Sequence, residues 1–136
     1  MSLIYQKNGN LIPGIHETTW AEFMLEFGYN KHRDKLIEGL ARVISDLKEA
    51  GVTILYVDGS FVSKKPEPAD FDACWDPTGV NFKKLSSLHP VLMDFMSDRA
   101  KQKAKYGGEL FPSPQFLAFF QRDREGQPKG IIKLNF

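Results

Sequence analysis

The feature that most constrains the fold is a long amphipathic helix followed directly by an apolar strand. Apolar residues recur at helical spacing between Lys31 and Ala50, and Gly51 supplies a natural stop. The next segment, Val52 to Val57, is nearly all apolar and partly β-branched, which is typical of a fully buried strand. We therefore expect an α/β (or α+β) fold, with a mixed sheet of about three to five strands and helices packed mainly on one side.

The composition fits one domain covering residues 1–136, because two domains would need roughly twice this length. The 18 basic and 17 acidic residues leave a net charge of +1, which argues against nonspecific nucleic-acid binding through bulk charge. The apolar runs are too short for a membrane-spanning helix or a signal peptide, so we expect no membrane partner. A single cysteine, Cys74, excludes an internal disulfide and a multi-cysteine zinc site, and the expected setting is the reducing cytoplasm.

Local patterns predict the other elements. Met1 to Thr19 is expected to be irregular, with a small hairpin around Asn8-Gly9-Asn10. Thr19 and Glu22 form a capping-box pattern for a short helix from Trp20 to about Phe27. The remaining predictions are a strand over Asp70–Trp75, a short helix or irregular segment over Val80–Leu88, a helix from Pro90 to Met96 extending weakly to Lys105, a strand over Glu109–Phe111, a helix over Gln115–Arg122 and a closing strand over Gly130–Phe136.

The residues that carry chemistry begin where the buried strand ends, at Asp58-Gly59-Ser60, and continue at Asp70-Phe71-Asp72. In a strand, Asp70 and Asp72 share one face, with side chains about 6–7 Å apart. Two like charges so close raise each other's pKa, and a hard cation such as Mg²⁺ relieves the repulsion. Gly59 lets backbone amides approach a phosphate closely, and Ser60 adds a hydroxyl donor.

Other polar residues allow both a functional and a structural interpretation. Ser63, Lys64 and Lys65 lie between the two motifs and are candidates for charge-assisted contacts to phosphates. Asp58 is interpreted as a turn-capping residue rather than a ligand, and Asp76 before Pro77 as an Asx-turn. The three histidines lack metal-ligand spacing and are interpreted as structural or surface residues. The basic run formed by Lys101, Lys103 and Lys105 is either a solvated helix face or a contact to phosphates of a nucleotide or RNA.

An apolar strand, a Gly-Ser turn and an Asp-x-Asp about eleven positions after the glycine together resemble the signature of the nucleotidyltransferase superfamily, which includes DNA polymerase β-like enzymes and minimal nucleotidyltransferases. The matching stretches are Ile54 to Ser60 and Ala69 to Trp75. The chain is also similar to small prokaryotic or phage proteins of this type, through Phe119 to Arg124 and Pro128 to Lys133. The resemblance implies a nucleotidyltransferase-like single domain.

The resemblance also implies residue roles. Gly59 and Ser60 would hold the triphosphate, and Asp70 and Asp72 would bind two Mg²⁺ ions. A third carboxylate on a later strand would help to activate the acceptor. The closing strand has no acid, so Glu109 is the first substitute and Asp123 the second. The loop after the turn also departs from the family, because it has Phe61-Val62 where an arginine-glycine element is usual.

These observations give three functional hypotheses. The first is a Mg²⁺-dependent transferase that moves a nucleoside monophosphate from a nucleoside triphosphate, expected to be ATP, to a hydroxyl of a protein, an RNA or a small molecule. The alternative is a catalytically weak or inactive binding or regulatory partner on the same fold, for example in a toxin–antitoxin or phage-defence module. The third is a plain structural domain with a fortuitous acidic strand. The chain is short for this superfamily, so a protein partner or a homodimer is expected to complete the site.

Overall fold

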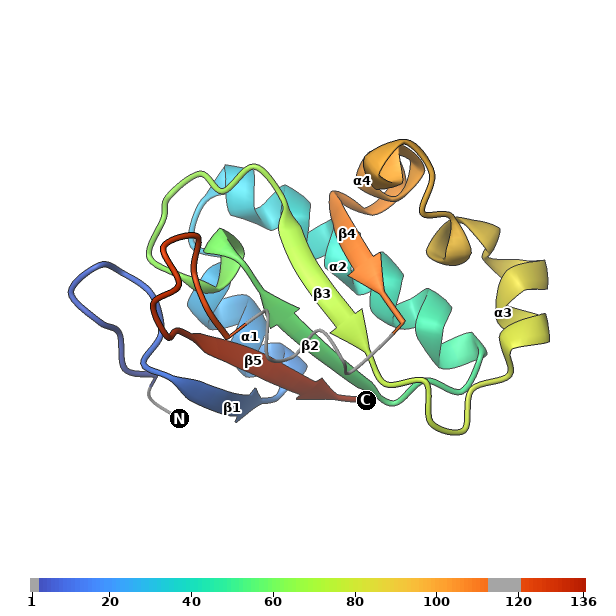
Figure 1. Ribbon diagram of the computed structural model, residues 1–136, viewed down its shortest axis with the longest axis horizontal. Coiled ribbons are helices and arrows are strands. Elements are labelled where there is room, and N and C mark those ends of the chain that lie inside the picture. Colours follow the sequence, from blue (N-terminus) through green and yellow to red (C-terminus); the bar gives the residue numbers. More distant parts are fainter. Residues whose placement is uncertain (1–2, 113–120) are drawn as a thin grey trace.

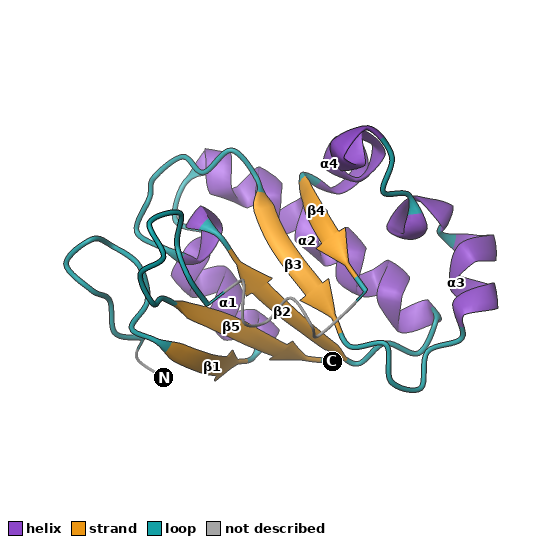
Figure 2. Cartoon of the chain, viewed as in Figure 1, coloured by secondary structure: helices purple, strands orange, loops and turns teal. Residues whose placement is uncertain are grey.

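The structure, a computed structural model, describes residues 3–112 and 121–136. Its strands form one five-stranded sheet in the order β1-β5-β2-β3-β4 (Figures 1 and 2). The strands are β1 (Gly14–Thr18), β2 (Ile54–Asp58), β3 (Phe71–Trp75), β4 (Gly108–Phe111) and β5 (Gly130–Asn135). The α-helices are α1 (Trp20–Phe27), α2 (Lys31–Glu49), α3 (Phe82–Leu88) and α4 (Ala100–Tyr106), and short 3₁₀ turns are η1 (Ser60–Val62), η2 (Pro90–Met93) and η3 (Ser97–Arg99).

The sheet is mixed, as predicted. β2 runs antiparallel to both of its neighbours, β3 and β5, whereas the outer pairs β1–β5 and β3–β4 are parallel. In Figure 1, α1 and α2 lie behind the sheet, while α3 and α4 gather beyond its β4 edge. The predicted fold class and the predicted one-sided helix layer are therefore confirmed.

The two faces of the sheet bury different amounts of apolar surface. Val57, Ala73, Leu110 and Ile132 face the main core, which they share with aromatic and aliphatic side chains of α1 and α2. Because side chains alternate along a strand, their neighbours point to the opposite face. There the smaller cluster contains Tyr56, Cys74, Phe111 and Ile131. The acidic residues of interest extend this second face at the end of the sheet where β2 ends and β3 and β4 begin.

The best predicted elements have strong local end signals. The Thr19–Glu22 capping box forms at the start of α1. At its end, the amide of Gly28 donates to the carbonyl of Met24. α2 covers the predicted range almost to its last residue. The Asp76 turn also forms, since Oδ1 of Asp76 accepts the amide of Thr78 at 2.9 Å.

Three regions differ from the prediction or fall outside it. β1 lies within the segment predicted as irregular, and it pairs with β5 at the edge of the sheet. The helix predicted from Pro90 is broken into η2, η3 and α4, because Ser97, Asp98 and Arg99 all adopt positive φ angles. The helix predicted over Gln115–Arg122 lies largely outside the described residues. In the described parts of the chain, no helix combines the length and apolarity needed to cross a membrane.

Candidate functional site

Strand register brings three carboxylates into a row across the sheet. Asp58 on β2 lies directly opposite Asp72 on β3, and Asp72 lies beside Glu109 on β4. Directly paired residues on neighbouring strands point to the same face, and adjacent strands lie about 5 Å apart. Asp70 joins the same face because it precedes Asp72 by two residues. We call Asp58, Asp70, Asp72 and Glu109 the acidic row.

Burial raises the pKa values of the three aspartates in the acidic row, and for Asp70 and Asp72 the charges of neighbouring carboxylates add to this effect. The pKa of Asp72 rises to about 7, first because its carboxyl is buried and then because Asp70, Glu109 and Asp58 are negative. The pKa of Asp70 is raised by burial and by the charge of Glu109. The pKa of Asp58 is raised by burial, although Lys129 opposes that effect. Ionisation of the carboxyl groups at the centre of the row is therefore unfavourable. A bound cation would favour it by offsetting the repulsion between the carboxylates.

Lysines neutralise both ends of the row. Lys129 places Nζ 3.0 Å from Oδ1 of Asp58, with side chains only 13% and 7% exposed. At the other end, Nζ of Lys103 lies 2.9 Å from Oε1 of Glu109. In the described part of the chain, no ion pair reaches Asp70 or Asp72. The carboxylate oxygens at the centre of the row are thus the donors that Mg²⁺ prefers, and they fit a divalent ion.

A cleft of about 760 Å³ opens over this end of the sheet. Figure 1 shows the two loops that border it, the green one after β2 and the dark red one before β5, at the same end of the molecule. Its acidic lining comes from Asp58, Asp70, Asp72 and Asp123, its basic lining from Lys65, Arg122, Arg124 and Lys129, and the remainder from Asn10, Gly59, Ser60 and Gly126. The cleft therefore brings together both predicted motifs and the loop before β5, which is remote from them in sequence.

Gly59 is required where it stands. Its φ of +83° lies in the left-handed region, which disfavours side chains. A Cβ atom added there would also lie 3.0 Å from Oδ2 of Asp72. Any other residue at position 59 would therefore be strained where this turn passes beside the acidic row.

Arg33, on α2, fixes the loop that follows this turn. Its side chain is fully buried. Its guanidinium donates to the carbonyls of Phe61 at 2.7 Å, Ser63 at 2.8 Å and Lys65 at 2.6 Å. A signal for this role is present in the sequence, since Arg33 shares helical spacing with the apolar residues three, four and seven positions later.

The predicted phosphate-binding residues divide into two groups. Gly59, Ser60 and Lys65 line the cleft. Ser63 does not, because its side chain is buried and its hydroxyl donates to the carbonyl of Ser60 at 2.6 Å. Lys64 does not either, because its ammonium lies 4.4 Å from the ring centre of Tyr5. The expected phosphate contacts of Ser63 and Lys64 therefore have no support in this geometry.

The two candidates for the third carboxylate lie in different surroundings, and of the two only Asp123 is among the residues that line the cleft. Oδ1 of Asp123 accepts the amides of Glu125 at 3.0 Å and Gln127 at 2.9 Å, so this carboxylate shapes its own loop. Glu109 instead stands beside Asp72 in the sheet register. Asp58, which sequence reasoning assigned to a turn, occupies the opposite side of Asp72, and only the pairing of β2 with β3 reveals this.

A family match covers nearly the whole chain. Residues 3–135 match the model described as "Family of unknown function (DUF6932)". The chain belongs to this family. No curated protein and no solved structure matches the chain. The DUF6932 match includes every residue of the acidic row and both loops of the cleft, but its description names no activity.

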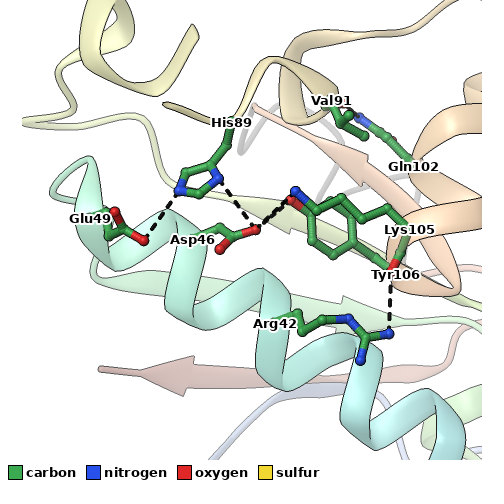
Figure 3. A network of polar contacts seen from close by, with 8 residues as sticks. All are labelled: Arg42, Asp46, Glu49, His89, Val91, Gln102, Lys105 and Tyr106. Atoms are coloured by element: carbon green, nitrogen blue, oxygen red, sulfur yellow. Dashed lines mark hydrogen bonds and ion pairs between the residues drawn. The ribbon is translucent and has the colours of Figure 1, made fainter. Parts of the chain in front are cut away.

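A second polar cluster of this DUF6932 chain lies away from the cleft, between α2 and α4 (Figure 3). His89 places Nδ1 3.5 Å from Oδ2 of Asp46 and Nε2 3.3 Å from Oε1 of Glu49. The same Asp46 oxygen receives the hydroxyl of Tyr106 at 2.7 Å and lies 3.6 Å from Nζ of Lys105. The three potential metal ligands Asp46, Glu49 and His89 converge here, but the ammonium of Lys105 already neutralises Asp46. We therefore interpret the cluster as a structural link between helices.

Proposed function

We propose that this protein is a Mg²⁺-dependent nucleotidyltransferase that moves a nucleoside monophosphate from a nucleoside triphosphate to an acceptor hydroxyl. The observation that carries the proposal is the acidic row, which adjoins the turn formed by Gly59 and Ser60 at one end of the sheet. A row of carboxylates beside a glycine turn is suited to a divalent cation and a phosphate chain together. We take ATP as the expected donor, and a protein, an RNA or a small molecule as the acceptor class.

Each residue would have a distinct role. Asp70 and Asp72 would hold the metal, which when bound would neutralise phosphate charge and align the reacting groups. Glu109 would help to activate the acceptor. The amide of Gly59 and the hydroxyl of Ser60 would donate to phosphate oxygens. The acceptor oxygen bonds to the α-phosphorus, pyrophosphate leaves, and the hydroxyl proton passes to a carboxylate of the row.

The position of Glu109 favours an enzyme over the inactive binding partner considered above. Phosphoryl transfer at such a site needs a carboxylate beyond the Asp-x-Asp pair to complete the metal ligands or to accept the proton. Glu109 neighbours Asp72 in the register, and its charge acts on both aspartates of the pair. An inactive binding partner would bind the triphosphate without transferring it, which the following experiment distinguishes.

The proposal predicts label transfer from α-labelled nucleoside triphosphates. The purified protein is incubated with Mg²⁺ and each triphosphate in turn, with cell extract as the acceptor source. We expect Asp72→Asn and Glu109→Gln to lower transfer by at least about 100-fold, because each removes a charge needed in the transition state. The control is Glu67→Gln, an exposed change outside the cleft. Triphosphate binding without transfer in the wild type would contradict catalysis and support the regulatory alternative.

The metal site is tested separately by calorimetric titration with Mn²⁺. Asp70→Asn and Asp72→Asn should each weaken Mn²⁺ binding at least about tenfold, whereas Glu67→Gln should leave it unchanged. The fold should persist in both variants, because each change also removes a like-charge repulsion. Unaltered Mn²⁺ affinity in both would rule out this metal site.

A further inference from the structure

The loop of residues 122–129, here called the basic wall, has a fixed shape. Arg122 and Pro128 form an antiparallel bridge, and the amide of Asp123 donates to the carbonyl of Gln127 at 2.9 Å. The Asp123 carboxylate accepts two further amides of the loop, as described above. At the base, the guanidinium of Arg122 donates to the carbonyl of Gly126 at 2.9 Å. The loop therefore presents its remaining cations, Arg124 and Lys129, from a braced hairpin.

Those two cations face different parts of the acidic row. Lys129 is held at 3.0 Å by Asp58 and also acts electrostatically on Asp72. Arg124 is exposed, lines the cleft and acts on Asp70. Lys65 approaches the same carboxylate from the loop after β2. The cleft thus has an acidic floor on the sheet and positive charge around it.

Such a cleft matches a ligand that carries both signs of charge. A divalent cation would neutralise the carboxylates on the sheet, and an anion bound to that cation would pair with the surrounding lysine and arginine side chains. The turn from Gly59 to Val62 contains no basic side chain, so it offers a phosphate chain only amides and a hydroxyl. The cationic contacts to such a chain must come from elsewhere in the cleft.

We propose that the basic wall is the polyphosphate-binding element of this protein, with Arg124 and Lys129 contacting the phosphate oxygens of a metal-bound triphosphate and Asp58 holding Lys129 in position. The assignment rests on the proposed function, because it places the triphosphate over the acidic row. It adds a loop remote in sequence from both motifs to the binding site.

The test uses inorganic tripolyphosphate with Mg²⁺ as the probe, measured by isothermal calorimetry on the full chain. Lys129→Gln and Arg124→Gln should each weaken tripolyphosphate binding about tenfold or more, because each removes a charge-assisted contact. Lys133→Gln is the control, since Lys133 lies four residues after Lys129, on β5, and outside the cleft. It should change the affinity less than twofold. Mn²⁺ binding should persist in all three variants, which separates loss of the wall from loss of the metal site.

Two outcomes would overturn the proposal. One is a wild-type protein that does not bind tripolyphosphate, and the other is binding by both variants within twofold of the wild type. Lys129→Gln leaves a buried Asp58 without its partner, so its folding is checked by circular dichroism, with Lys129→Arg as the charge-conserving variant that should retain binding. Arg124→Gln changes an exposed side chain and keeps the test valid if Lys129→Gln unfolds. The readout is tripolyphosphate binding and not label transfer. Loss of phosphate binding by the basic wall and absence of nucleotidyl transfer therefore give different results.

Discussion

The side chain of Arg33 determines the path of the chain beyond Gly59, because one planar guanidinium satisfies several carbonyls at once. Besides its bonds to the loop after the turn, it donates to the carbonyl of Phe27 at 3.1 Å. Its charge also lies 5.0 Å from the ring centre of Phe61 and 4.6 Å from that of Tyr29. No carboxylate neutralises Arg33 within the described residues, so backbone dipoles and aromatic faces alone stabilise this buried charge.

We predict that Arg33→Lys lowers the free energy of unfolding by about 2–4 kcal/mol, because an ammonium cannot reach all of these carbonyls and the unreached ones stay buried without a donor. Urea denaturation measures the change. Arg42→Lys is the control on the same helix, since Arg42 is exposed and donates to one carbonyl, that of Lys105 at 3.2 Å. It should cost no more than about 0.5 kcal/mol. Equal effects of the two substitutions would show that Arg33 does not fix the loop.

At the scale of elements, the contact between α2 and α4 depends on one residue without a side chain. A Cβ atom at Gly39 would collide with the backbone carbonyl of Tyr106, the last residue of α4. Tyr106 is itself almost fully buried and donates its hydroxyl to Asp46 on α2. The position of α4, and of β4 that follows it, therefore depends on the close approach at Gly39.

We predict that Gly39→Ala destabilises the protein by about 1–3 kcal/mol, the usual cost of overpacking, although alanine is the better helix former in isolation. Thermal unfolding followed by circular dichroism measures the effect. Ser45→Ala, at an exposed position of the same helix, should be neutral or slightly stabilising. A stabilising effect of Gly39→Ala would mean that α4 does not pack against α2 at this point.

The elements that the sequence predicted well are those whose signals are local. Thr19 marks the start of α1, helical spacing marks α2, and period two places Asp70 and Asp72 on one face. β1 was missed because its partner, β5, lies more than a hundred residues away. The place of Asp58 beside Asp72 was missed for the same kind of reason, since it depends on strand register. The position of Glu109 beside Asp72 likewise depends on the pairing of β3 with β4, which no local pattern reveals.

At the scale of the whole molecule, the acidic row makes stability depend on pH. The pKa of Asp72 is about 7 in the folded protein, against an ordinary value of 3.8. Between these values the folded state therefore binds more protons than the unfolded state, so the free energy of unfolding falls as pH rises from about 4 to about 7. The raised pKa values of Asp70 and Asp58 act in the same direction, while Lys129 limits the effect.

We predict a lower melting temperature at pH 8 than at pH 5 in the presence of a chelator, and a smaller difference in Asp72→Asn, which cannot ionise. Adding Mg²⁺ at pH 8 should raise the melting temperature of the wild type, because a ligand that binds only the folded state stabilises it. The comparison of wild type with Asp72→Asn removes the contributions of groups elsewhere. The same pH dependence in both proteins would contradict the assigned pKa of Asp72.

The strand order has a consequence for how the chain reaches its native state. β5 follows the other described strands in sequence, yet it lies between β1 and β2 and pairs with both. Pairing of β1 with β5 must close a loop of more than a hundred residues. The chain therefore loses conformational entropy before the stabilising contacts form. Until β5 docks, β2 presents an open edge that can pair with another chain. Docking of β5 is therefore the step that should limit the folding rate, and the same step brings Lys129 to Asp58.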